Sequence, residues 1–179
     1  AIGAGYPGVA ALHLIVHATF KAPLFLIAGA AGDATGSYRL DRMRLGRIMP
    51  LIAGLAVIAA AGLAGLPLTA GGWSKEEIVK AAEHADVWLS LGVMVGGALS
   101  AVYATRFMLL AFGRRSDDDR ELPAPAWAET VGIAVLVALT LSGSLLWLSP
   151  VADTIAAAFS LSLPKGSTWG LVLSMTMLA

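Results

Sequence analysis

The sequence predicts an all-α, polytopic transmembrane helix bundle that contains a discontinuous helix. Hydrophobic residues make up 58% of the 179 residues and charged residues only 13%, and the mean hydropathy is +0.78. This composition lies outside the usual balance of a water-soluble domain. Four apolar runs reach the length of about 20 residues that a membrane-spanning helix requires. The charged residues collect in the short stretches between these runs.

The predicted crossings follow from the apolar runs in order. They cover residues 9–32, 51–71, 87–112 and 127–148, and a further span begins near residue 169. Residues 149–164 are too few and too polar to span, so we expect an interfacial helix there. Because the sequence stops within an apolar run, we expect residues 1–179 to be a fragment of one transmembrane domain.

The distribution of arginine predicts the orientation of these crossings. The loop at residues 33–49 carries four arginines and the loop at 113–126 carries three, whereas the opposite connections carry none. Two crossings separate the loops, so both lie on one side of the membrane. The positive-inside rule places them in the cytoplasm, with the chain in the plasma membrane.

Charge and cysteine content exclude several functions. Twelve basic residues balance twelve acidic ones without a basic cluster, so no nucleic-acid partner is expected. The chain has no cysteine, which removes disulfides and thiolate ligation. His13 and His17 are four residues apart, but no Glu follows His13 and no third ligand is evident. We predict neither a metal site nor a cofactor.

The first span carries a stripe of protonatable residues. His13, His17 and Lys21 follow each other at intervals of four and share one helix face. A charge at the position of Lys21 costs at least about 2.5 to 3.5 kcal/mol on insertion scales, which indicates a partner or a hydrated cavity. Pro23 cannot donate to the Thr19 carbonyl and leaves that oxygen available to water. The stripe could therefore relay protons.

Two further positions keep alternatives open. In the alternative interpretation, Lys21 has a structural role and forms an ion pair with an acidic residue on a neighbouring helix. Arg106 lies about two turns from the cytoplasmic end of the third span and either snorkels to that end or makes a buried pair.

The stretch around Lys75 also has two readings. Ser74 and Glu77 form a capping-box pattern, which predicts a helix that begins at Ser74. Residues 51–71 could span unaided, leaving Lys75 and Glu76 in a solvated helix outside the membrane. Alternatively, Pro67 and the glycine pair Gly71 and Gly72 break one crossing over residues 51–83 near 67–73, with Lys75 at the break. The residues alone do not decide between the two.

Several motifs together resemble a known family. The stretches "LHLIVHATFKAPLFLIAG", "GLPLTAGGWSKEEI" and "YATRFMLLAFG" are similar to the antiporter-like membrane subunits shared by Mrp-type multisubunit cation/proton antiporters and respiratory complex I. The segment "GDATGSYRLDRM" further resembles the large membrane subunit of the Mrp type. The resemblance implies a broken helix at Lys75.

The resemblance also implies a function. It assigns His13, His17, Lys21 and Lys75 to the proton path of a Na⁺/H⁺ antiporter subunit, which is a transporter and not an enzyme. Expected partners are other membrane subunits, the lipid bilayer, protons and monovalent cations. The possible supporting positions are Thr19, Pro23, Glu76 and Arg106. The alternatives are a proton-pumping subunit of an NADH-quinone oxidoreductase and a non-transporting membrane scaffold.

Overall fold

The computed structural model describes residues 1–67, 69–113 and 122–163, and within these ranges the regular structure is helical without strands. The all-α prediction is therefore confirmed. The predicted span near residue 169 lies outside the described residues, as does most of the 113–126 loop. The helices are η1 Ile2–Ala4, α1 Pro7–Thr35, α2 Leu40–Met43, α3 Pro50–Ala64, α4 Ala70–Ala85, α5 Val87–Ala111, α6 Trp127–Ser142, η2 Gly143–Trp147 and α7 Ser149–Ala158.

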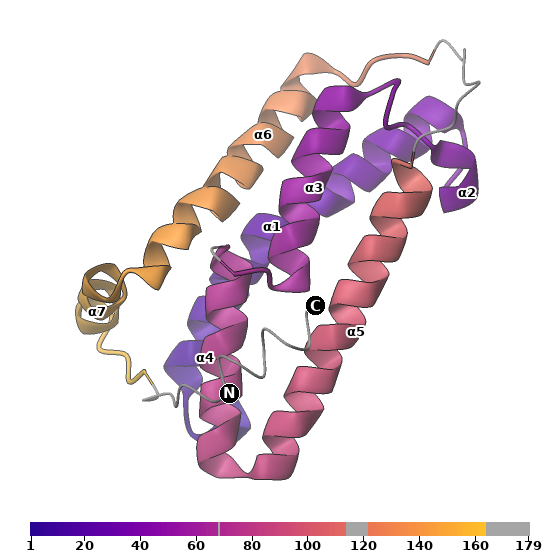
Figure 1. Cartoon of the computed structure of the whole chain (residues 1–179). Coiled ribbons are helices and arrows are strands. Elements are labelled where there is room, and N and C mark those ends of the chain that lie inside the picture. Colours follow the sequence, from indigo (N-terminus) through magenta and orange to yellow (C-terminus); the bar gives the residue numbers. More distant parts are fainter. Residues whose placement is uncertain (68, 114–121, 164–179) are drawn as a thin grey trace.

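Three long helices form the frame of the described bundle. By length and composition, α1, α5 and the stretch formed by α6 and η2 could each cross a membrane. In α1, Phe20 and Ile27 are fully buried against the other helices. Figure 1 shows these long helices from the side and α7 nearly end-on beside the end of α6.

The helices α3 and α4 are shorter and follow each other along α5. They contain 15 and 16 residues, which corresponds to about 22 and 24 Å at 1.5 Å per residue. Each is shorter than the roughly 30 Å hydrocarbon core of a bilayer. Both pack against α5, and in Figure 1 α4 lies below the end of α3.

The interruption between α3 and α4 has a clear local cause. Gly65 ends α3 in a left-handed conformation with φ of 85°, which glycine adopts without a steric penalty. Pro67 lacks an N–H group and cannot continue the helical hydrogen bonding. Thr69 then caps α4, because its side chain accepts a hydrogen bond from the Gly72 N–H at 3.0 Å. The helix α3 therefore ends at Ala64, and α4 begins at Ala70.

The prediction that a helix begins at Ser74 is wrong. The helix α4 begins at Ala70, and Ser74 lies in its second turn, where its hydroxyl donates to the Gly71 carbonyl at 3.2 Å. The glycine pair that suggested a break lies inside the helix. At Gly71 an added Cβ would collide with the Gly62 carbonyl oxygen. Close packing of the α4 start on the α3 end therefore explains the glycines.

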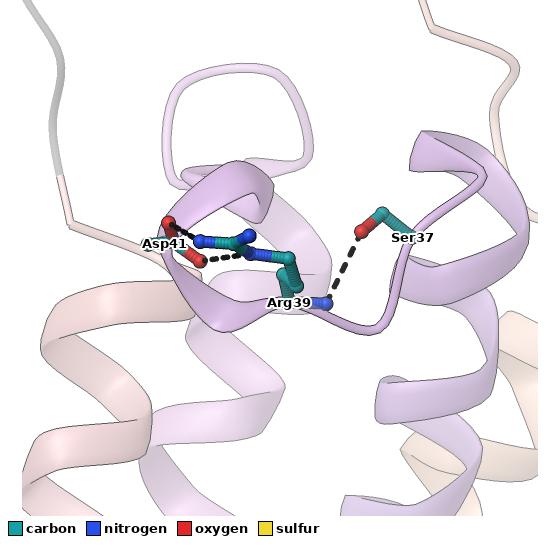
Figure 2. A network of polar contacts seen from close by, with 3 residues as sticks. All are labelled: Ser37, Arg39 and Asp41. Carbon is teal, nitrogen blue, oxygen red and sulfur yellow. Dashed lines mark hydrogen bonds and ion pairs between the residues drawn. The ribbon is translucent and has the colours of Figure 1, made fainter.

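The connection between α1 and α3 packs against the end of α5. The Leu45 N–H donates to the Ala111 carbonyl at 2.8 Å, so the connection after α1 and the last residues of α5 lie at the same end of the bundle. Figure 2 shows that Arg39 binds the Asp41 carboxylate in two hydrogen bonds, at 3.2 and 3.0 Å, and that its N–H donates to Ser37. The Arg39 hydrogen bond lowers the pKa of Asp41 below its ordinary value.

Candidate functional site

The Lys75 side chain lies against the end of α3. Its Nζ donates to the carbonyl oxygens of Leu63 at 2.6 Å and Ala64 at 3.2 Å, and to the Ser100 hydroxyl oxygen at 2.9 Å. We call these three acceptors the oxygen cradle. It joins α3, α4 and α5 around one ammonium group, so it satisfies all three donors of that group.

The two carbonyls of the oxygen cradle are available because α3 ends there. The Leu63 carbonyl would bond the N–H four residues on in a continuing helix, but that residue is Pro67. Orphan carbonyls at a helix C-terminus also carry the negative end of the helix dipole, which favours a cation. Gly65 leaves room for the lysine, since an added Cβ would lie 2.7 Å from Lys75 Cδ. The end of α3 thus creates the site.

A cavity of about 220 Å³ adjoins the oxygen cradle, and we call it the Lys75 cavity. His13, Lys75, Glu76, Ser100 and Trp147 are among its lining residues, together with glycines of α4 and α5. This volume has room for several water molecules, and polar side chains are present to bind them. The cavity brings His13 of α1 to the same space as Lys75 of α4.

His13 connects the Lys75 cavity to a second opening. Its Nδ1 lies 3.1 Å from the Ser74 hydroxyl, next to Lys75 in sequence. His13 also lines a surface hollow together with His17, and the centroids of the two imidazole rings are 5.5 Å apart. The predicted neighbours His13 and His17 are therefore close in space, and His13 borders both openings.

Lys21 occupies a different environment from the two histidines. Its Nζ donates to the Tyr103 hydroxyl at 3.4 Å and lies 5.7 and 5.9 Å from the ring centroids of Phe25 and Tyr103. These groups line a separate cavity of about 170 Å³, which Leu63 also lines. The stripe thus divides, because Lys21 faces α5 whereas His17 contacts the rings of His13 and Phe20.

The predicted supporting residues lie in contrasting surroundings. Glu76 is 5% exposed and lines the Lys75 cavity. Pro23 is buried inside α1, and the Thr19 hydroxyl donates to the Val16 carbonyl at 2.7 Å. Arg106 is exposed on α5 and is not among the residues that line the three cavities described above.

Several contacts of the site could not be recognised from sequence patterns. Ser100 and Tyr103 approach the two lysines through the packing of α5, and nothing near them in sequence signals this. Trp147 donates to the Thr69 carbonyl at 3.0 Å and anchors the segment between α3 and α4. A signal did exist for the Leu63 carbonyl, since a proline four residues later always frees such an oxygen.

The described ranges contain no group of three or more His, Asp or Glu side chains placed to hold a metal ion. What the site offers is neutral oxygens, a lysine, a histidine and a buried carboxylate around a small cavity. Such a set can bind a monovalent cation and can accept and release protons.

Sequence comparison links the chain to a transmembrane family that includes oxidoreductase and antiporter subunits. The family described as NADH:quinone oxidoreductase/Mrp antiporter, transmembrane, matches residues 2–100. Subunit L of the F(420)H(2) dehydrogenase of Methanosarcina mazei is 36% identical over 124 residues, which are 63% of this chain and 18% of the relative. NADH-ubiquinone oxidoreductase chain 5 of Sus scrofa is 31% identical over 116 residues, 62% of this chain and 19% of the relative.

An antiporter relative and a solved structure extend the comparison. The A1 subunit of the Na(+)/H(+) antiporter of Staphylococcus haemolyticus is 36% identical over 115 residues, 58% of this chain and 14% of the relative. The Mrp complex from Dietzia sp. DQ12-45-1b superposes with a TM-score of 0.70 at 28% identity, over 95% of this chain and 20% of that one. The chain spans less than a fifth of the curated relatives named here. Together with the fold, the match over residues 2–100 shows that the chain belongs to the NADH:quinone oxidoreductase/Mrp antiporter transmembrane family.

Proposed function

We propose that the chain is part of a proton-conducting subunit of a multisubunit monovalent cation (Na⁺)/proton antiporter. The observation that carries this proposal is the shared cavity of His13 and Lys75, at the point where α3 and α4 are interrupted. An ammonium held by uncharged oxygens beside a hydrated space can exchange its proton with water. The subunit would transport ions and would not be an enzyme by itself.

The proton path in this proposal begins with the histidines and includes both lysines. His17 and His13 would pass protons between the surface hollow and the Lys75 cavity, since His13 borders both. Lys21 would be a separate station, and Leu63 lies between the two lysines because it lines the Lys21 cavity and its carbonyl accepts from Lys75. The α3 and α4 pair would act as one interrupted crossing, as in discontinuous transporter helices.

The assembly and orientation follow the same proposal. The relatives are named as subunits or chains of larger assemblies, which supports other membrane subunits as partners. The plasma membrane would hold the chain with the arginine-rich connections at residues 33–49 and 113–126 in the cytoplasm, because positive loops are retained there.

The test measures cation-driven proton movement in everted vesicles that contain the full-length subunit in its assembly. A fluorescent probe follows the collapse of a pH gradient when NaCl is added. We expect wild type to respond and Lys75→Ala to lose the response, because the proposed exchange requires the Lys75 amine. Lys75→Arg is the matched control for charge: it keeps the cation but does not release a proton, so it should also fail.

Three other outcomes would replace the proposal. A wild-type assembly that ignores Na⁺ and other monovalent cations, but acidifies the vesicles when a reduced electron donor is supplied, would be a redox-driven proton pump like the dehydrogenases in the family. Variants that assemble normally and transport normally would remove Lys75 from the path. Variants that lose only assembly would support the scaffold alternative.

A further inference from the structure

We infer that the oxygen cradle is a binding site for a partly dehydrated monovalent cation such as Na⁺, which the cation and the Lys75 ammonium occupy in turn. The inference rests on the proposed function and adds the place where the transported cation would bind. It starts from the observation that the oxygen cradle already surrounds a positive group, at 2.6, 3.2 and 2.9 Å.

The chemistry of the three acceptors suits an alkali cation. Two are backbone carbonyls at the end of α3, of which that of Leu63 would face Pro67 in a continuing helix, and the third is a hydroxyl. Carbonyls of unwound backbone and of half-helix C-terminal ends coordinate Na⁺ in discontinuous transporter helices. The dipole of α3 adds negative potential at this end. Uncharged oxygens also hold a monovalent ion weakly enough to release it.

The Lys75 cavity can complete the coordination of such an ion. Its volume of about 220 Å³ adjoins the oxygen cradle and has room for waters that would act as additional ligands. The buried Glu76 side chain lines the same cavity and adds carboxyl oxygens to its polar lining. The cation would therefore retain part of its hydration.

Two positive charges cannot occupy the oxygen cradle together, because at this separation in a partly dry site they repel strongly. Entry of Na⁺ requires the Lys75 ammonium to lose one proton. The N–H electron pair stays on Nζ, and the proton leaves the cavity with a water molecule, either directly or after passing through His13, which lines it. The neutral amine then leaves the oxygens. One monovalent cation replaces one proton, and the charge of the site is unchanged.

The test measures proton release on cation binding, separately from transport. The purified assembly with the full-length subunit is placed in weakly buffered detergent solution with a pH-sensitive dye, and NaCl is added, with choline chloride as the salt control. Retention of radioactive Na⁺ gives the amount bound. We expect wild type to release one more proton per assembly than Lys75→Gln does, while Lys75→Gln still binds Na⁺. In that variant the Na⁺ affinity of the site should no longer depend on pH.

A second variant tests the oxygens without touching the lysine. Ser100→Ala removes one acceptor, and we expect the Na⁺ concentration for half-maximal proton release to rise about two- to tenfold, the effect of losing one ordinary polar contact. Ser142→Ala is the matched control. The Ser142 hydroxyl donates to the Leu139 carbonyl at 2.9 Å, as the Ser100 hydroxyl does to the Gly97 carbonyl, but Ser142 does not line the Lys75 cavity.

The outcomes separate this inference from the proposed function. Equal proton release from wild type and Lys75→Gln would overturn the inference, and so would an unchanged half-maximal concentration in Ser100→Ala. Either result could accompany normal antiport by wild type, in which case the proposed function survives. A wild-type assembly that fails the vesicle test would instead remove the proposed function.

Discussion

Lys21 and Lys75, the two lysines of the proposed proton path, show how differently an apolar bundle can hold the same side chain. Lys75 has three oxygen acceptors, two on α3 and one on α5. Lys21 has one long hydrogen bond to Tyr103 and the faces of two aromatic rings. Aromatic faces attract a cation but accept no proton. Tyr103 therefore provides the hydroxyl that fixes the orientation of the Lys21 ammonium.

At the residue scale we expect Tyr103→Phe to slow Na⁺-dependent proton exchange about two- to tenfold, the loss associated with one polar contact. The ring and its attraction for Lys21 remain, so the amount of assembled subunit should stay at the wild-type level. The measurement is the initial rate of gradient collapse in everted vesicles at equal subunit content. Tyr38→Phe serves as control, because Tyr38 is 72% exposed in the connection after α1. Equal rates in Tyr103→Phe and wild type would show that the Tyr103 hydroxyl has no part in transport.

The sequence could predict which side chains share a helix face better than it could predict contacts between helices. Intervals of four residues correctly brought His13 and His17 together, because the helix period alone determines this. The side-chain hydrogen-bond partners of Lys21 and Lys75 are Tyr103 and Ser100 on α5, 82 and 25 residues away. Such contacts depend on how helices pack, and a period of four contains no information about packing.

The connection between α3 and α4 combines an abrupt helix end with close packing of the two helices. Gly65, Pro67 and Thr69 end one helix and start the next. The capping box at Ser74 misled the prediction because the Thr69 cap lies five residues earlier and competes with it. A glycine pair was interpreted as a helix breaker, whereas Gly71 and Gly72 allow the backbones of α3 and α4 to approach. Local propensity does not distinguish these two uses of glycine.

We expect Gly71→Ala to destabilise the subunit by at least about 1 to 3 kcal/mol, the range for overpacking a tight interior. An added Cβ would meet the Gly62 backbone carbonyl, which cannot move as a side chain end does. Thermal unfolding of the purified assembly and the amount of subunit in membranes are the measurements.

Gly54→Ala provides the matched comparison for that substitution. Gly54 also lies inside a helix, α3, but an added Cβ there would meet nothing within 4 Å. This variant should be neutral or slightly more stable, because alanine favours a helix interior by about 0.5 to 1 kcal/mol. Equal stability of the two variants would show that α3 and α4 are not closely packed at this point.

At the scale of the whole molecule, the bundle has two distinct ends. The connection after α1 packs on the end of α5 through Leu45 and Ala111, and the α4–α5 turn lies at the opposite end in Figure 1. The apolar runs could predict the long helices because length and hydropathy are properties of the sequence itself. The cavities could not be predicted, since they form where three or more helices meet.

We expect thiol labelling to assign these ends to the two sides of the membrane. The chain has no native cysteine, so each introduced thiol is the only one in this segment. Asp33→Cys and Ala85→Cys lie at exposed positions near opposite ends. A membrane-impermeant maleimide should label Asp33→Cys in everted vesicles and Ala85→Cys on intact cells, in agreement with the positive-inside rule. The reverse pattern would invert the proposed orientation.

The closeness of Gly71 to the Gly62 carbonyl has a mechanical consequence. The backbones of α3 and α4 are in close contact here, and the Trp147 hydrogen bond to the Thr69 carbonyl also holds the connection between them. This connection cannot open or bend without breaking contacts. It would behave as a rigid connection and not as a hinge. A change of charge at Lys75 would then affect neighbouring groups through the electric field and through reorientation of side chains and water. The helices themselves would not move.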